Sequence, residues 1–81
     1  MSIETEWRDA ARALWNDLRR GNDDARLLAM DVMYDAPSMG VDAFADMFAG
    51  KIQGWYRAAG YERDAETCWL IASELWPLAR R

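Results

Sequence analysis

The class of fold follows most directly from residues 3–22, which read IETEWRDAARALWNDLRRGN. Apolar residues return in this segment at intervals of four, three, four and four positions: Ile3, Trp7, Ala10, Leu14 and Leu18. Polar and charged residues, Arg8, Asp9, Arg12 and Asn16, fill the opposite side, which is the pattern of an amphipathic helix with one face on a hydrophobic core. Because Gly21 ends the pattern and is a favourable C-terminal cap, the segment predicts a helix over residues 3–20.

A second helix is expected directly after Gly21. Asn22 is a good N-cap, and Asp23 and Asp24 then fall in the first turn, where the helix dipole stabilises anions. The helix continues through a series of large apolar residues: Leu27, Leu28, Met30, Val32, Met33 and Tyr34. Only a strip of aspartates interrupts this apolar surface. We therefore expect the helix to be mostly buried, with the strip at the surface, and to stop at Pro37.

A third helix is predicted after a loop at residues 36–41. Asp42 is its candidate N-cap, and Gly60 closes it. Its apolar face is formed by Phe44, Phe48, Ile52, Trp55 and Ala59. Gly50 and Gly54 fall inside the helix, where each costs about 1 kcal/mol relative to alanine. Two explanations stay open: a neighbouring helix approaches the backbone closely at these glycines, or the helix is flexible or broken there.

A fourth helix is predicted from about Asp64 to Trp76, with Pro77 disrupting its end. The positions expected to face the core are Ala65, Cys68, Trp69, Ala72, Leu75 and Trp76. No segment shows the sustained period-two alternation of a strand. The sequence therefore predicts an all-α fold, a compact bundle of three or four helices, with residues 1–81 forming a single domain.

The chain lacks the side chains on which most enzymes and metal sites depend. It contains no histidine, one cysteine and one lysine, Lys51. Cys68 lies on an apolar helix face and is expected in the core rather than as a reactive thiol, while Lys51 is expected at the surface. The aspartates do not have the spacing of a calcium loop, and the glycines do not form a phosphate-binding loop. We expect no enzyme activity, no cofactor and no metal.

Charge and hydropathy limit the class of partner. The formal net charge is -4, and the clusters of cations are only local ones, Arg19-Arg20 and Arg80-Arg81, so direct binding to nucleic acid is not expected. The longest stretch without charge is residues 67–73, much shorter than the ~20 residues of a membrane span. Glu4 and Glu6 do not suit a secretory signal, and a single cysteine excludes an internal disulfide. A cytoplasmic protein with a basic protein partner is expected.

The least ordinary feature is the charge of residues 22–50, where six aspartates accompany one cation, Arg26. Asp24, Asp31 and Asp35 share one side of the second helix, and Asp42 and Asp46 continue the spacing beyond the Pro/Gly break. Like charges so arranged repel each other by a few tenths of a kcal/mol per pair. Folding therefore does not explain them, and the candidate partner-binding residues are Asp24, Asp31, Asp35, Asp42 and Asp46. The alternative is an ordinary solvated surface.

Aromatic residues and methionines offer a second kind of binding surface. The chain has five tryptophans and five methionines. Most are expected in the core, but Trp15, Met33, Met39 and Met47 are candidates for interface anchors, since tryptophan is enriched at binding hot spots and methionine adapts to irregular surfaces. This alternative predicts a helical adaptor module, as a monomer or a dimer.

In its size, helical pattern and surface aspartates, the chain resembles the small acidic proteins that phages use to disable host defence, of which the anti-CRISPR proteins are the best-known group. The resemblance covers the whole chain and involves no motif. It implies an inhibitor in the host cytoplasm that blocks a nucleic-acid-binding site of a CRISPR effector complex by occupying it, without chemistry.

Overall fold

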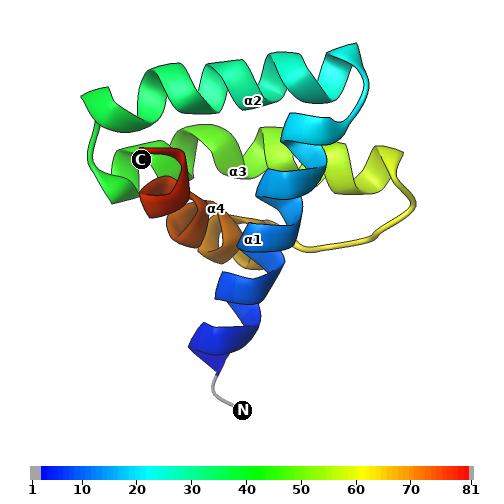
Figure 1. The fold of residues 1–81 in the computed structure, drawn as a ribbon. Coiled ribbons are helices and arrows are strands. Elements are labelled where there is room, and N and C mark those ends of the chain that lie inside the picture. Colours follow the sequence, from blue (N-terminus) through cyan, green and yellow to red (C-terminus); the bar gives the residue numbers. More distant parts are fainter. Residues whose placement is uncertain (1–2, 81) are drawn as a thin grey trace.

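The structure, a computed structural model, describes residues 3–80, and the side chains of residues 6–80. Its elements are the helices α1 (Ile3–Arg20), α2 (Asp23–Asp35), α3 (Val41–Ala58) and α4 (Ala65–Ala79), with one turn of 3-10 helix, η1 (Ala36–Ser38) (Figure 1). No strand occurs within residues 3–80. The prediction of an all-α bundle of three to four helices is confirmed.

Helix α4 is the centre of the packing. It lies against α3 and α1 and also touches η1 and α2. Helix α2 packs mainly against α1, and its packing against α3 is slight. Figure 1 shows α2 and α3 running antiparallel, with α1 at a steep angle to both. Helix α2 is therefore the outermost element, held chiefly along one side.

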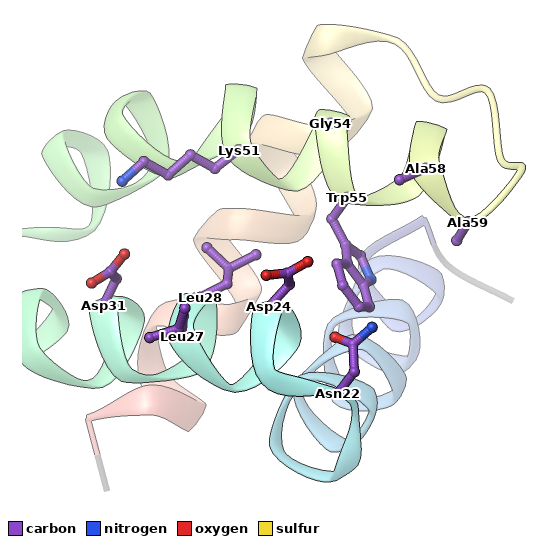
Figure 2. A pocket seen from close by; sticks show the side chains of 10 residues that line it. All are labelled: Asn22, Asp24, Leu27, Leu28, Asp31, Lys51, Gly54, Trp55, Ala58 and Ala59. Atoms are coloured by element: carbon purple, nitrogen blue, oxygen red, sulfur yellow. The ribbon is translucent and has the colours of Figure 1, made fainter.

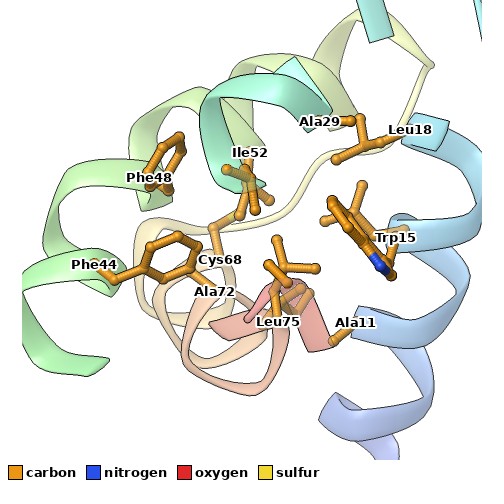
Figure 3. Packing of buried hydrophobic residues seen from close by; sticks show 14 of the residues in the cluster. Ala11, Trp15, Leu18, Ala29, Phe44, Phe48, Ile52, Cys68, Ala72 and Leu75 are labelled. Carbon is orange, nitrogen blue, oxygen red and sulfur yellow. The ribbon is translucent and has the colours of Figure 1, made fainter. Parts of the chain in front are cut away.

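One hydrophobic cluster joins all four helices (Figure 3). Its largest fully buried side chains are Leu14, Leu18, Val32, Phe44, Phe48, Ile52, Cys68, Ile71 and Leu75. The rings of Phe44 and Phe48 pack against each other at a tilt of 35°, with their centroids 4.7 Å apart. At the edge of the cluster, the Trp76 indole N–H donates to the carbonyl oxygens of Ala36 and Met39 at 3.0 Å each. These bonds fasten the turn after α2 to α4.

The helix boundaries of α1 agree with the prediction, and its expected core positions Leu14 and Leu18 are buried. The side chain of Ile3 lies outside the described side chains. Gly21 follows the helix as expected, but its φ is not positive. A Cβ at Gly21 would lie 2.6 Å from the Cβ of Ala25 and 2.8 Å from the carbonyl oxygen of Asp17. Crowding between α1 and α2, rather than a left-handed cap, requires glycine here.

The expectation that the second helix is mostly buried is wrong. Its fully buried residues are the small ones, Ala25, Ala29 and Val32. Four large apolar residues, Leu27, Met30, Met33 and Tyr34, are between 51% and 83% exposed. The reason is that α1 and α4 cover only one side of α2, and small side chains on that side let the helices approach closely. The large residues lie on the uncovered side.

The start of α2 was predicted correctly, since the Asn22 side chain accepts a hydrogen bond from the backbone N–H of Ala25 at 3.0 Å. The expected cap of α3 is wrong. Helix α3 begins at Val41 with Gly40 as its N-cap, so Asp42 lies in the first turn instead. Gly60 closes the end of α3 as predicted, with a φ of 92°.

Neither close approach by a neighbouring helix nor a break in the helix explains Gly50 and Gly54. Helix α3 runs unbroken through them, and a Cβ at either position would meet no atom within 4 Å. Pro77 also differs from expectation, because α4 continues past it to Ala79. A proline removes one helical hydrogen bond, and a helix that has only a few residues left can tolerate that loss.

Candidate functional site

Three of the predicted partner-binding residues lie together on α2. We call Asp24, Asp31 and Asp35 the acidic strip. Asp24 and Asp31 are exposed and Asp35 is half-buried. The ion pairs among the side chains of residues 6–80 join Arg8 to Glu74 at 3.8 Å and Arg12 to Asp9 at 4.0 Å, so none reaches the strip. Its charges therefore remain available to a cation from outside the chain.

The other two predicted residues, Asp42 and Asp46, lie on a different side of the molecule. Asp46 faces α4, where its Oδ1 accepts a hydrogen bond from the Trp69 indole N–H at 2.7 Å. At about 100° per residue, Asp46 is about 140° around α3 from Lys51 and about 180° from Trp55, which both face α2. The five aspartates thus form two groups, and the regular spacing across the break is not continued in space.

A groove of about 630 Å³ separates α2 from α3 (Figure 2). The wall along α2 consists of Asn22, Asp24, Leu27, Leu28 and Asp31. The wall along α3 consists of Lys51, Gly54, Trp55, Ala58 and Ala59. This volume is within the range of about 300–1,000 Å³ typical of binding clefts. We call it the α2–α3 groove.

Charge is distributed unevenly in the α2–α3 groove. Figure 2 shows Asp24 and Asp31 pointing from α2 toward α3, and Trp55 projecting from α3 toward Asn22. Lys51, on the opposite wall, has its Nζ 5.1 Å from the centroid of the Phe48 ring. It forms no ion pair within 4.0 Å with either aspartate of the groove. The wall along α2 is therefore negative, and its two carboxylates form no close ion pair with the lysine of the opposite wall.

The exposed side of α2 carries a row of large apolar residues. Leu27, Met30 and Tyr34, which we call the outer ridge, are 59%, 63% and 83% exposed and recur at helical spacing. Asp31 is about 40° around the helix from Leu27, so the acidic strip borders the outer ridge. Exposed apolar surface next to polar residues is typical of interaction sites. The sequence analysis missed it by assigning these residues to the core.

A sequence signal for the outer ridge exists. Ala25, Ala29, Val32 and Ala36 follow each other at intervals of four, three and four, and all four are buried. A face of small residues at this period indicates close helix packing, which leaves the large residues of the same helix for another contact. The large side chains were more conspicuous, and they suggested burial instead.

The sequence left open whether four residues lie in the core or at an interface, and the structure places two of them at the core and leaves two exposed. Trp15 is buried, and Met39 packs against the core. Met33 and Met47 are 51% and 48% exposed. Each tryptophan is at least partly buried, so the exposed anchors in the described part of the chain are methionine, leucine and tyrosine side chains.

Two ionisable side chains, Cys68 and Tyr56, lie inside the fold. Cys68 is fully buried, as predicted, and burial raises the pKa of its thiol although the nearby Arg63 opposes this. Burial likewise raises the pKa of Tyr56, again against the effect of Arg63. Within residues 3–80 no group of three or more potential metal-ligating side chains comes together. No helix in this part of the chain is sufficiently long and apolar to cross a membrane.

Comparison with models of protein families, with curated proteins and with solved structures finds no match to this chain. The candidate site is therefore interpreted from its own geometry and chemistry. Its parts are the acidic strip, the outer ridge and the α2–α3 groove, and all three include residues of α2.

Proposed function

We propose that this chain is a non-catalytic inhibitor that binds a basic surface of another protein and blocks it by occupation. The observation that carries the proposal is the pairing, on one helix, of an acidic strip that no ion pair of the described side chains reaches and an outer ridge of exposed apolar residues. Apolar area supplies much of the affinity of protein interfaces, while charge complementarity supplies specificity and speed of association. Helix α2 offers both.

The proposed partner surface is one that otherwise holds nucleic acid. Asp31 and Asp35 are about 6 Å apart along the helix axis, and Asp24 is about 10 Å from Asp31. These separations are comparable with two or three phosphates of a DNA strand, which rise about 3.4 Å each. A CRISPR effector complex is the first target to test. In this proposal Asp42 and Asp46 add only to the overall negative potential.

Two matched double variants test the site. Asp31→Asn with Asp35→Asn, and Asp42→Asn with Asp46→Asn, each remove two charges from neighbouring turns of one helix. The second pair is the control, because asparagine keeps the oxygen that accepts the Trp69 hydrogen bond. Affinity for a CRISPR effector complex is measured by titration at several salt concentrations. We expect the first pair to weaken binding about tenfold at low salt and to reduce the salt dependence, and the second to have a much smaller effect.

Two results would count against the proposal. Equal weakening by both pairs would mean that overall charge, and not the strip on α2, determines the affinity. Unchanged affinity with the first pair would remove the strip from the interface. Circular dichroism and urea denaturation of each variant establish that the fold is retained.

A second candidate function, a helical adaptor that associates through apolar residues, is favoured by the exposure of Met30, Met33 and Tyr34. It predicts a concentration-dependent dimer in sedimentation velocity. Met30→Ser with Tyr34→Ser would dissociate such a dimer, whereas Asp31→Asn with Asp35→Asn would leave it intact. An exclusively monomeric chain at high concentration would exclude the dimeric form of this candidate.

A further inference from the structure

We infer that the α2–α3 groove receives an amphipathic helix of the partner, with basic residues on one flank. The inference rests on the proposed function and specifies the partner segment that the site binds. Two antiparallel helices with slight mutual packing form the groove, and a third helix can lie between them as it does in a helical bundle. The apolar face of such a segment would contact Leu28, Trp55 and Ala58.

The groove wall on α3 leaves room for a closely packed backbone. Gly54 lines the groove, and a Cβ at this position would meet no atom of the chain within 4 Å. A glycine inside a helix costs about 1 kcal/mol relative to alanine, and no contact within the chain requires it here. Contact with a partner helix supplies a reason for the missing side chain.

Charge complementarity selects a basic occupant. Asp24 and Asp31 are seven residues apart, about 10.5 Å along α2, and both point into the groove. A partner helix with lysine or arginine at positions seven apart places two cations at the same separation. Lys51 on the opposite wall favours an acidic residue on the other flank of the partner helix, which fixes its orientation.

A second copy of this chain does not fit the same requirement. If two copies paired antiparallel along α2 about a two-fold axis, the same flank of α2 would lie on the same side of the pair in both copies. The two acidic strips would therefore lie next to each other and repel. A parallel pairing would place a single cation, Arg26, against three aspartates. The net charge of -4 adds to the repulsion between copies. A basic segment of a different protein is the occupant that we infer.

The test is an NMR titration of the 15N-labelled full chain with a synthetic amphipathic peptide of about five helical turns. The peptide carries lysines seven positions apart, with leucines between them, and its control carries glutamates in their place. We expect saturable shifts at the amides of Leu28, Gly54 and Ala58, smaller shifts at Met30 and Tyr34, and binding about tenfold weaker for the control peptide.

Two leucine variants distinguish groove binding from surface binding. Gly54→Leu fills the groove and should weaken peptide binding about tenfold. Gly50→Leu is the matched control, because Gly50 is also exposed and internal to α3 but does not line the groove. It should leave the affinity unchanged. Both variants remove a helix-weakening glycine, so loss of the fold does not explain a difference between them.

Several outcomes would overturn the inference: shifts confined to Met30 and Tyr34, equal binding of both peptides, equal effects of the two leucine variants, or no binding at millimolar peptide. The failure of the proposed function is separate. If Asp31→Asn with Asp35→Asn weakens binding to the effector complex and Gly54→Leu does not, the partner binds α2 outside the groove and only the inference fails. If the aspartate pair has no effect on the complex, the proposed function fails.

Discussion

Asp46 differs from the acidic strip because its carboxylate has a partner inside the chain, the Trp69 indole N–H at 2.7 Å. A hydrogen bond of this kind contributes about 1 kcal/mol to stability. We expect Asp46→Ala to lower the free energy of unfolding by about that amount, and Asp46→Asn to lower it by less than about half as much, since its amide oxygen still accepts the bond. Urea denaturation measures both. Equal losses would show that the hydrogen bond does not stabilise the fold.

Cys68 and Tyr56 make stability depend on alkaline pH. Burial raises both pKa values above the usual 9.0 and 10.0, so the unfolded chain loses these protons first as the pH rises. The folded state then binds more protons than the unfolded state, and the free energy of unfolding falls with pH. We expect these two groups to make their full contribution to the free energy of unfolding below pH 9.0, and a progressively smaller contribution above it.

Urea denaturation at a series of alkaline pH values measures this loss. Tyr56→Phe removes one of the two ionising groups, so its free energy of unfolding should fall less steeply with pH than that of the unmodified chain. A free energy of unfolding that stays constant across pH 9.0 and 10.0 would contradict the assignment of both groups to the folded interior.

At the scale of single elements, the two internal glycines of α3 are positions where a substitution should stabilise the fold, whereas most substitutions destabilise a protein. Because a Cβ at Gly50 or Gly54 meets no atom within 4 Å, alanine adds helix propensity without a clash. We expect Gly50→Ala and Gly54→Ala each to stabilise the fold by up to about 1 kcal/mol, or about 4–8 °C in Tm. Thermal unfolding followed by circular dichroism measures the change.

Gly60 is the control for this prediction. Its φ of 92° lies in the left-handed region, so Gly60→Ala should destabilise the fold by about 1 kcal/mol or more. If Gly50→Ala and Gly54→Ala also destabilise the chain, α3 must bend or pack against another element at these positions.

The sequence predicted the elements better than their surroundings. The prediction of α1 was correct because its apolar residues occupy a single face, and only one orientation of the helix buries them. Helix α2 has apolar residues almost all round, so its pattern does not indicate which side is covered. Which side of α2 is covered depends on how closely α1 approaches Ala25 and Ala29, and this follows from the tertiary packing, not from the pattern of one helix.

The candidate site was predicted in part for a similar reason. Within α2, the spacing of Asp24, Asp31 and Asp35 was enough to place them on one side, because helical periodicity holds inside a helix. It does not hold across η1, where the 3-10 turn and Gly40 reset the direction of the chain. For this reason Asp42 and Asp46, in regular spacing along the sequence, face away from α2.

At the scale of the whole molecule, stability should be unevenly distributed. Helices α3 and α4 bury Phe44, Phe48, Ile52, Ile71 and Leu75, whereas α2 buries Ala25, Ala29 and Val32 and exposes its larger residues. Burial contributes about 25 cal/mol per Å² of apolar surface, so hydrophobic burial stabilises the packing of α2 much less than that of α3 or α4. We expect α2 to open locally at a smaller free energy than the rest of the bundle.

Native-state hydrogen exchange tests this difference residue by residue. Amides of α2 around Met30 should exchange faster than those of α3 around Ile52, even though both lie in the middle of a regular helix. Equal protection would mean that the chain unfolds only as a unit and that α2 is not a separable element. Under the proposed function, binding of the partner covers α2, so its amides should gain the most protection in the complex, while those around Ile52 change little.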